Sequence, residues 1–330
     1  MYAAYITGYG DGRMNKIGTI HDAVNAVRSE VFKVFAGRDD PMDLLMTGFF
    51  AGLPVLIEDI PGVGKTTLAR GLAAACSLDF GRIQFTPDLL PGDVTGMTIW
   101  SQEARDFVFK PGSVMHNFVL ADEINRAPAR TQAALLEAMQ EGSVTVDGIT
   151  HALPEPFFLV ATQNPLNYAG TFQLPEAQLD RFGISFSIGY PDREQEIRIV
   201  GDTGRADSFA RISPVLEAQE ITAVRDTVDR VLVSDPVMHY IVDLLEATRR
   251  SGNLRTGASP RAGRHLARAA QAHSFLEGRS FVLPEDVRSL VNAVLTHRVS
   301  LAPDARLAGR RVQDVLAEIV NPIPMPSGLE

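Results

Sequence analysis

Apolar residues along the first half of the chain follow two different spacings. Short uninterrupted apolar runs, typical of strands buried on both faces of a parallel sheet, occupy residues 54–57, 118–121 and 157–161. Apolar residues that recur every three or four positions, which predict helices, occupy residues 17–35, 41–52, 66–76 and 130–140. Strands and helices in alternation predict an α/β fold of three layers, αβα, over residues 17–190.

The pattern becomes purely helical after residue 190. Helical spacing is found over residues 193–203, 237–250, 261–277, 284–300 and 312–320. We therefore predict an all-α domain over residues 191–330. Residues 1–16 are rich in Gly and Tyr without periodicity, and we expect them to form a mobile tail.

Composition narrows the class of protein. The 330 residues are 45% hydrophobic and 22% charged, as in a globular protein with enough chain for two domains. A net charge of −9 disfavours a general binder of duplex DNA. The longest strongly apolar run, residues 44–57, is shorter than the roughly 20 residues of a membrane-spanning helix. No signal peptide is visible and Cys76 is the single cysteine, so we expect a cytoplasmic protein without membrane insertion.

The strongest chemical signal lies between the first predicted strand and the helix from residue 66. It reads Asp59-Ile60-Pro61-Gly62-Val63-Gly64-Lys65-Thr66-Thr67. Glycines let backbone N–H groups approach phosphate oxygens, and the helix N-terminus adds positive charge. We expect Lys65 to bind the β- and γ-phosphates and Thr66 to ligate Mg²⁺. Pro61, Gly62, Val63, Gly64, Lys65, Thr66 and Thr67 thus form a predicted site for ATP or ADP.

One position departs from the usual phosphate-loop pattern. Asp59 stands where the pattern has glycine. Asp tolerates unusual backbone angles better than most residues, so we still expect the turn to form. The alternative, a strand–helix turn without a ligand, is disfavoured because strand, loop and helix occur together.

Acidic and amide side chains follow the other two predicted strands. Asp122 and Glu123 end the run 118–121, and Asn164 follows the run 157–161. Ligands of open α/β sheets bind at the carboxyl ends of the strands. We expect Asp122 to hold Mg²⁺, Glu123 to polarise the attacking water, and Asn164 to contact the γ-phosphate or position that water. Read alone, an Asn at the position of Asn164 is more often a turn residue, and the other two elements favour the functional interpretation.

These motifs together resemble a known family. The chain resembles AAA+ ATPases of the MoxR type, in the clade with an insert in the second core helix, near magnesium-chelatase ATPase subunits. The resemblance spans about residues 17–301 and rests most strongly on residues 58–66, 122–127, 132–141, 161–165, 174–182 and 257–262. It implies an ATP-driven homo-oligomeric ring, commonly a hexamer. Such rings act with von Willebrand factor A (VWA)-type partners in chaperone-like assembly or metal insertion.

The resemblance also implies roles for arginines. Arg181, at the end of a helix predicted over 176–182, matches the arginine finger that reaches a neighbour's γ-phosphate; the alternative is a salt bridge with Glu176 or Asp180. Arg261 matches the second sensor of the lid, since a cation in a helix's first turn is unfavourable unless a phosphate compensates. The same role is open to Arg264 and Arg268. Arg126 contacts either a neighbouring subunit or solvent.

Two segments have the alternation of β-hairpins, residues 96–112 and 141–154, and the first falls where the family carries its insert. Trp100, Phe107 and Phe109 lie in the first hairpin. Such a ribbon cannot bury three aromatics within itself, so they pack on the core or face a partner.

The leading hypothesis is an ATP-hydrolysing motor. A nucleotide-gated binding scaffold with negligible turnover is the alternative, and a DNA-remodelling ATPase is disfavoured by the charge. The client protein is not identified by any motif.

Overall fold

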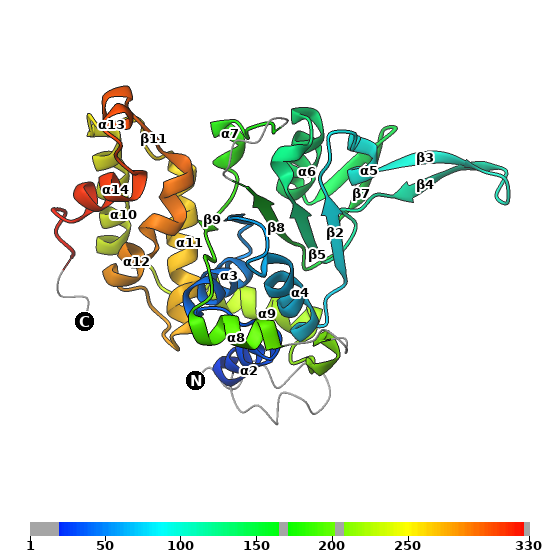
Figure 1. Ribbon diagram of the computed structural model, residues 1–330, viewed down its shortest axis with the longest axis horizontal. Helices are drawn as coiled ribbons and strands as arrows, with labels where there is room; N and C mark the ends of the chain where they lie inside the picture. The colour runs from blue at the N-terminus through cyan, green and yellow to red at the C-terminus, as the bar shows by residue number, and fades with distance from the viewer. Residues whose placement is uncertain (1–19, 165–170, 202–207, 327–330) are drawn as a thin grey trace.

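The protein, seen here as a computed structural model, is described over residues 20–164, 171–201 and 208–326. Figure 1 shows a central sheet with helices on both faces, a helical region to one side and a hairpin that projects from the other. The proposed N-terminal tail, residues 1–16, lies outside the described residues.

The sheet has five parallel strands in the order β2-β5-β8-β1-β9. Their bounds are β1 Val55–Glu58, β2 Phe80–Gln84, β5 Phe118–Asp122, β8 Phe158–Gln163 and β9 Ile184–Phe186. The α/β prediction is confirmed, and β1, β5 and β8 are the strands expected from the sequence. The pattern analysis missed β2 and β9. Both lie at sheet edges; β2 alternates buried and exposed residues and β9 has three residues, so neither forms a continuous apolar run.

Alternate residues of each strand pack into two different cores. Val55 and Ile57 of β1 face one core and Leu56 faces the other. The helices α2 Ile20–Phe32, α3 Asp39–Ala51 and α4 Lys65–Ala75 contribute to the first core. The helices α5 Pro91–Thr95 and α6 Ala129–Glu141 contribute to the second. Burial on both faces explains why the central strands are apolar throughout.

The helical region is the described part of the chain after Tyr190. It contains α8 Arg193–Gly201, α9 Ala218–Val228, α10 Asp235–Arg250, α11 Pro260–Leu276, α12 Pro284–Leu295, α13 Pro303–Leu307 and α14 Val312–Val320. Its core is continuous with the first core of the sheet. Within the described ranges, no helix is both long and apolar enough to cross a bilayer.

The helical region departs from the all-α prediction at one place. The helix expected over 284–300 stops at Leu295, and a 3₁₀ turn, η3 Thr296–Arg298, follows. The chain then pairs as β11 Ser300–Leu301 with β10 Leu254–Thr256 in a short antiparallel ribbon. Val299, the one apolar residue between Leu295 and Ser300, is buried immediately before this ribbon.

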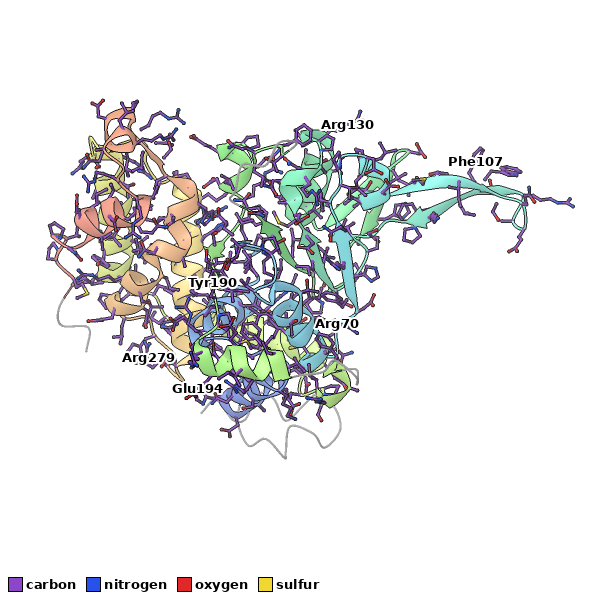
Figure 2. The ribbon with its side chains drawn as sticks, viewed as in Figure 1. Arg70, Phe107, Arg130, Tyr190, Glu194 and Arg279 are labelled. Atoms are coloured by element: carbon purple, nitrogen blue, oxygen red, sulfur yellow. The ribbon has the colours of Figure 1, made fainter. Side chains whose placement is uncertain are left out.

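Two antiparallel hairpins extend the α/β part. One consists of β3 Gly96–Ser101 and β4 Asp106–Pro111, and the other of β6 Ser143–Val146 and β7 Ile149–Ala152. Asp147 and Gly148 have positive φ values of 49° and 81°, as a tight hairpin turn requires. The β3–β4 hairpin projects from the body, and Phe107 lies far out on it (Figures 1 and 2).

The aromatics of the β3–β4 hairpin divide between core and solvent. Phe109 packs on the second core, and its ring stacks on His151 at 3.7 Å between centroids. Trp100 and Phe107 are 56% and 66% exposed and meet edge-on at 5.3 Å. Of the two alternatives left open for these rings, Phe109 therefore follows packing on the protein's own core, and Trp100 and Phe107 do not.

Candidate functional site

The loop between β1 and α4 has the backbone of a phosphate-binding loop. Gly62 and Gly64 adopt φ values of 88° and 89°, a left-handed conformation that favours glycine. Gly64 is also the N-cap of α4, whose first backbone hydrogen bond joins the Leu68 N–H to the Gly64 carbonyl at 2.9 Å. The N–H groups ahead of that bond point out of the helix N-terminus and suit an anion.

Lys65 lies folded over this loop. Its Nζ donates to the carbonyl oxygens of Asp59 and Ile60 at 2.8 and 2.7 Å. Burial lowers the pKa of Lys65, and the nearby carboxylates of Asp59, Asp122 and Glu123 oppose that shift. The structure thus brings the loop and the acidic pair within electrostatic range of each other, as the sequence predicts.

Asp59 has a structural role that explains the departure from glycine. It does not adopt a positive φ, so this loop does not need glycine there. Its carboxylate accepts hydrogen bonds from the N–H groups of Ile60 at 2.8 Å and Gly189 at 2.7 Å. Asp59 is 7% exposed and joins the start of the loop to the chain that leaves β9.

Asp122 is held by two side chains from neighbouring strands. Its Oδ1 accepts from the Thr162 hydroxyl at 2.6 Å, and its Oδ2 accepts from Arg82 Nη2 at 2.6 Å. Thr162 is fully buried, and its hydroxyl also accepts from the Glu123 N–H at 2.9 Å. The sequence analysis missed Thr162 and Arg82. A polar residue at the end of an apolar strand was the available signal for Thr162.

Glu123 has a strained backbone and a restrained carboxylate. Its φ and ψ are 55° and 50°, which costs a residue with a side chain on the order of 1–2 kcal/mol and is typical of functional sites. Its Oε2 accepts from Arg126 Nη1 at 2.8 Å and from Gln84 Nε2 at 3.3 Å. The Arg126 side chain is 51% exposed, which agrees with the solvent alternative, and its guanidinium also pairs with Glu123.

The segment after the acidic pair is held by buried amides. Asn125 Nδ2 donates to the carbonyl of Asn164 at 3.1 Å, which joins this segment to the end of β8. Gln132 is fully buried, and its Nε2 donates to the carbonyls of Ile124 and Ala127 at 3.2 and 3.1 Å. These contacts bring Asn164 beside the acidic pair. They depend on packing that the sequence pattern did not reveal.

The residues present fit a magnesium ion that is held mainly by phosphate and water. Among the described residues there is no group of three or more His, Cys, Asp or Glu side chains that could hold a metal. Mg²⁺ in nucleotide sites needs only one or two protein oxygens. Thr66 at the start of α4 and Asp122 at the end of β5 supply a hydroxyl and a carboxylate of the required kind.

Arg181 lies beyond a helix that is shorter than predicted. The helix α7 spans Glu176–Leu179, not 176–182, because the Gly183 N–H bonds to the Pro54 carbonyl at the entry to β9. The alternative salt bridges of Arg181 do not form: Glu176 pairs with Arg255 at 2.5 Å, and Asp180 contacts the helical region. The Arg181 side chain makes no ion pair with any residue that the structure describes.

The three arginines considered for the lid sensor lie in different surroundings. Arg261 Nη1 is 3.6 Å from Asp180 Oδ2, beside Arg181. Arg268 donates to the Ala51 carbonyl at 2.9 Å and pairs with Asp229. Its guanidinium is therefore bound at the end of α3 and after α9. Arg264 is exposed. Arg261 is therefore the one of the three that contacts the segment carrying Arg181.

Two buried histidines next to this segment make stability depend on pH. His297 Nε2–H donates to the Phe182 carbonyl at 3.0 Å. Burial and the nearby Arg298 lower the pKa of His297 to about 3, and the same two causes lower the pKa of His265 to about 3. Since histidine in an unfolded chain has a pKa near 6.5, the unfolded state binds more protons between about pH 6.5 and pH 3. Stability is therefore lost as pH falls through that window.

We expect His297→Gln to reduce this pH dependence, since glutamine keeps an N–H for the Phe182 carbonyl and does not titrate. Urea unfolding at pH 7 and pH 5 measures it. The loss of unfolding free energy over that interval should be smaller in the variant by about 2 kcal/mol. Equal losses in both proteins would contradict the assignment of a depressed pKa to His297.

Comparison with known proteins agrees with this geometry. Residues 54–184 match the ATPase family associated with various cellular activities (AAA), and residues 246–319 match the AAA lid domain. The uncharacterised protein YeaC of Bacillus subtilis is 41% identical over 93% of this chain and 96% of its own length. Chaperone MoxR1 of Mycobacterium tuberculosis is 35% identical over 97% of this chain and 85% of its own length.

A solved structure shares the fold as a whole. The crystal structure of a candidate ATPase from Cytophaga hutchinsonii superposes with a TM-score of 0.88 at 35% identity, covering 95% of this chain and 98% of that one. Identity of this order over nearly full length, the two matched AAA regions and the site geometry lead to one conclusion. The chain belongs to the MoxR family of AAA+ ATPases.

Proposed function

We propose that this protein binds Mg-ATP and hydrolyses it to ADP and phosphate within a hexameric ring of identical subunits. One observation carries the proposal. Lys65 of the glycine-rich loop and the acidic pair Asp122–Glu123 lie within electrostatic range at the carboxyl ends of β1 and β5. This is where open α/β sheets bind ligands, and the residue types suit phosphate, magnesium and an attacking water.

In the proposed site the loop residues from Pro61 to Thr67 bind the phosphates. Lys65 exchanges two neutral carbonyl acceptors, those of Asp59 and Ile60, for charged phosphate oxygens. Thr66 and Asp122 are the protein groups for Mg²⁺, Asp122 acting through water because Arg82 and Thr162 already contact its two oxygens. A bound Mg²⁺ would neutralise part of the negative charge of the phosphates.

Glu123 is the proposed base that polarises the attacking water, and Asn164 the group that orients it. In the structure Arg126 and Gln84 both contact Oε2 of the Glu123 carboxylate, so Oε1 is the proposed acceptor for the water. Thr162 supports this role, because one hydroxyl bonds both to Asp122 and to the backbone of Glu123 and so fixes their relative position.

Arg181 is the proposed arginine finger, inserted against the nucleotide of the neighbouring subunit. Its support is a partly exposed position after α7 and the lack of an ion pair within the described part of its own chain. Arg261 is the proposed sensor of the lid. Because Arg261 lies against Asp180, next to Arg181, we infer that both arginines serve the same nucleotide.

The ring is proposed to act on protein clients in the cytoplasm, in assembly, activation or metal insertion, with a partner that contains a VWA-type domain. The Mycobacterium relative is named a chaperone, which supports the proposal that the clients are proteins. The net charge of −9 fits a protein client better than a nucleic acid.

The comparison of Lys65→Ala with Glu123→Gln tests the proposed activity. The first variant should lose ATP binding, and the second only turnover. A wild-type chain that binds ATP and releases no phosphate would instead be the nucleotide-gated scaffold.

The exposed aromatic pair of the β3–β4 hairpin is proposed to couple the ATP cycle to a client. Trp100→Ala should leave basal ATP turnover unchanged and change the free energy of unfolding by less than about 1 kcal/mol, because the ring is largely exposed. Urea unfolding and phosphate release measure both. Phe109→Ala is the matched control; it removes a ring that packs on the core and should cost about 2 kcal/mol or more.

Trp100 is also the only tryptophan, so its emission reports on the hairpin alone. We expect the spectrum to differ between ADP and a non-hydrolysable ATP analogue. Identical spectra without nucleotide, with ADP and with the analogue would contradict a coupling role for the hairpin.

A further inference from the structure

The backbone on both sides of Arg181 is held by side chains of the helical region. Arg298 of η3 donates to three carbonyls there: Nη1 to Gly183 at 3.3 Å, and Nη2 to Asp180 at 3.4 Å and to Phe182. His297 adds a bond to the Phe182 carbonyl at 3.0 Å. We name residues 180–183 the finger segment. Its carbonyl groups are thus bound from a part of the chain more than a hundred residues away.

The Asp180 carboxylate is bound by the same region. Arg298 Nε lies 3.3 Å from Asp180 Oδ1, and the Ser259 hydroxyl donates to that oxygen at 2.8 Å. Arg261 Nη1 lies 3.6 Å from Oδ2. Side chains from the start of α11 and from η3 therefore converge on the residue directly before Arg181.

Arg298 is buried to a degree that is rare for a cation. Its side chain is 1% exposed. Burial lowers its pKa to about 10, with Asp180 opposing the shift, so it stays charged at neutral pH. His265, kept neutral by its own lowered pKa, can accept from Arg298 Nη2 at its Nδ1. Removing one member of such a buried set leaves the others without hydrogen-bond or ion-pair partners, which lowers the stability of the folded state.

The core anchors the finger segment at Phe182, which is fully buried in the second core. The preceding helix α7 has four residues, so Arg181 is not carried on a long rigid element. Its side chain has no ion pair with any described residue. The backbone is fixed from the helical region while the side chain is left available.

We propose that Arg298 is a positioning residue that sets the placement of Arg181 through Asp180 and the carbonyls of the finger segment. The helical region of a subunit thereby decides whether that subunit can serve its neighbour's ATP. This inference rests on the proposed action of Arg181 on the adjacent subunit. It adds a residue that the family motifs did not single out.

The first test is Arg298→Lys, which keeps the charge and loses the planar fork that reaches three carbonyls and a carboxylate of the finger segment. A displacement of about 1 Å can cost on the order of a hundredfold in rate. We expect kcat to fall by at least about tenfold, with the Kd for ATP within about twofold. Loss of ATP affinity with unchanged kcat would overturn the proposal.

Arg279→Lys is the matched control. Arg279, labelled in Figure 2, makes a bidentate ion pair with Asp286 at 2.6 and 2.7 Å. Asp286 lies in the first turn of α12, whereas Arg298 follows the last turn of that helix. This variant also loses a guanidinium pair with a buried carboxylate in the helical region, the Arg279 side chain being 24% exposed. It should lower the unfolding midpoint and leave kcat within about twofold. A comparable loss of kcat in Arg279→Lys would show that general destabilisation explains both variants.

Mixed rings distinguish a role toward the neighbour from a role in the subunit's own site. Arg298→Lys mixed with Lys65→Ala should recover turnover, because Lys65→Ala subunits present an intact finger to intact loops. A mixture of Arg298→Lys with Arg181→Ala should recover no turnover, because neither variant supplies a working arginine finger to the neighbouring subunit. The reverse pattern would place Arg298 in its own subunit's site and overturn the inference.

Hydrogen exchange tests the positioning independently of the ring. The N–H groups of Asp180, Arg181, Phe182 and Gly183 are all bonded to backbone carbonyls. Arg298→Lys should speed exchange across residues 179–183, whereas Arg279→Lys should not. If mixtures of Arg181→Ala with Lys65→Ala fail to recover turnover, the proposed action on the neighbour is wrong while exchange still decides whether Arg298 holds the segment. Unchanged exchange in Arg298→Lys overturns the inference.

Discussion

Glu123→Gln should bind ATP as tightly as the wild-type chain and hydrolyse it at least about a hundredfold more slowly. Removing a positioned general base typically costs 10²–10⁴-fold. The amide matches the carboxylate in shape, and the Thr162 hydroxyl still accepts from the backbone N–H of residue 123. The strained backbone should therefore keep its place while the base is lost.

The measurement pairs equilibrium binding of a fluorescent ATP analogue with steady-state phosphate release. Lys65→Ala should lose binding, because it removes the ammonium at the centre of the loop. Glu137→Gln, an exposed glutamate of α6, is the matched control and should change neither quantity. Equal loss of binding in Lys65→Ala and Glu123→Gln would show that the acidic pair is misassigned.

Arg181→Ala is the second substitution with a large expected effect. An arginine finger contributes on the order of 10³–10⁵ to the rate, so turnover should fall by at least about a thousandfold while ATP binding is kept. The side chain has no ion pair with the described residues that its loss would break. Folding stability should accordingly change by less than about 1 kcal/mol.

Subunit mixing shows which site the arginine serves. Arg181→Ala and Lys65→Ala are each expected to be inactive alone, and their mixture should regain turnover where an intact finger meets an intact loop. Arg230→Ala, which removes an exposed arginine elsewhere, controls for the loss of positive charge. If no mixing ratio restores turnover and the ATP-bound protein is a monomer by size, the role of Arg181 toward the neighbour is wrong.

The sequence predicted those features that are specified by residues close together along the chain. The loop from Pro61 to Thr67, the acidic pair after an apolar run and the three central strands each occupy about ten residues or fewer. A strand buried on both faces must be apolar at every position, so β1, β5 and β8 were visible directly. The family resemblance added Arg181 and Arg261 by their motifs.

The features that the sequence missed lie where burial is one-sided or brief. The edge strand β2 carries Arg82 and Gln84. Their polar side chains interrupt the apolar run by which the central strands were predicted. These same side chains contact Asp122 and Glu123. The helix expected over 284–300 was too long, because periodicity does not distinguish a helix end from a 3₁₀ turn whose residues are also buried.

By itself the sequence determined the α/β fold, the glycine-rich loop after β1 and the acidic pair after β5, because backbone conformation and burial impose patterns on neighbouring residues. Only the tertiary structure decided which side chains hold them. Thr162 meets Asp122 across 40 residues of chain, Asp59 meets Gly189 across 130, and Arg298 meets Gly183 across 115. Such pairs form through strand register and the packing of the helical region on the sheet. A hydrogen bond needs only a donor and an acceptor at the right distance, and no spacing along the chain records that.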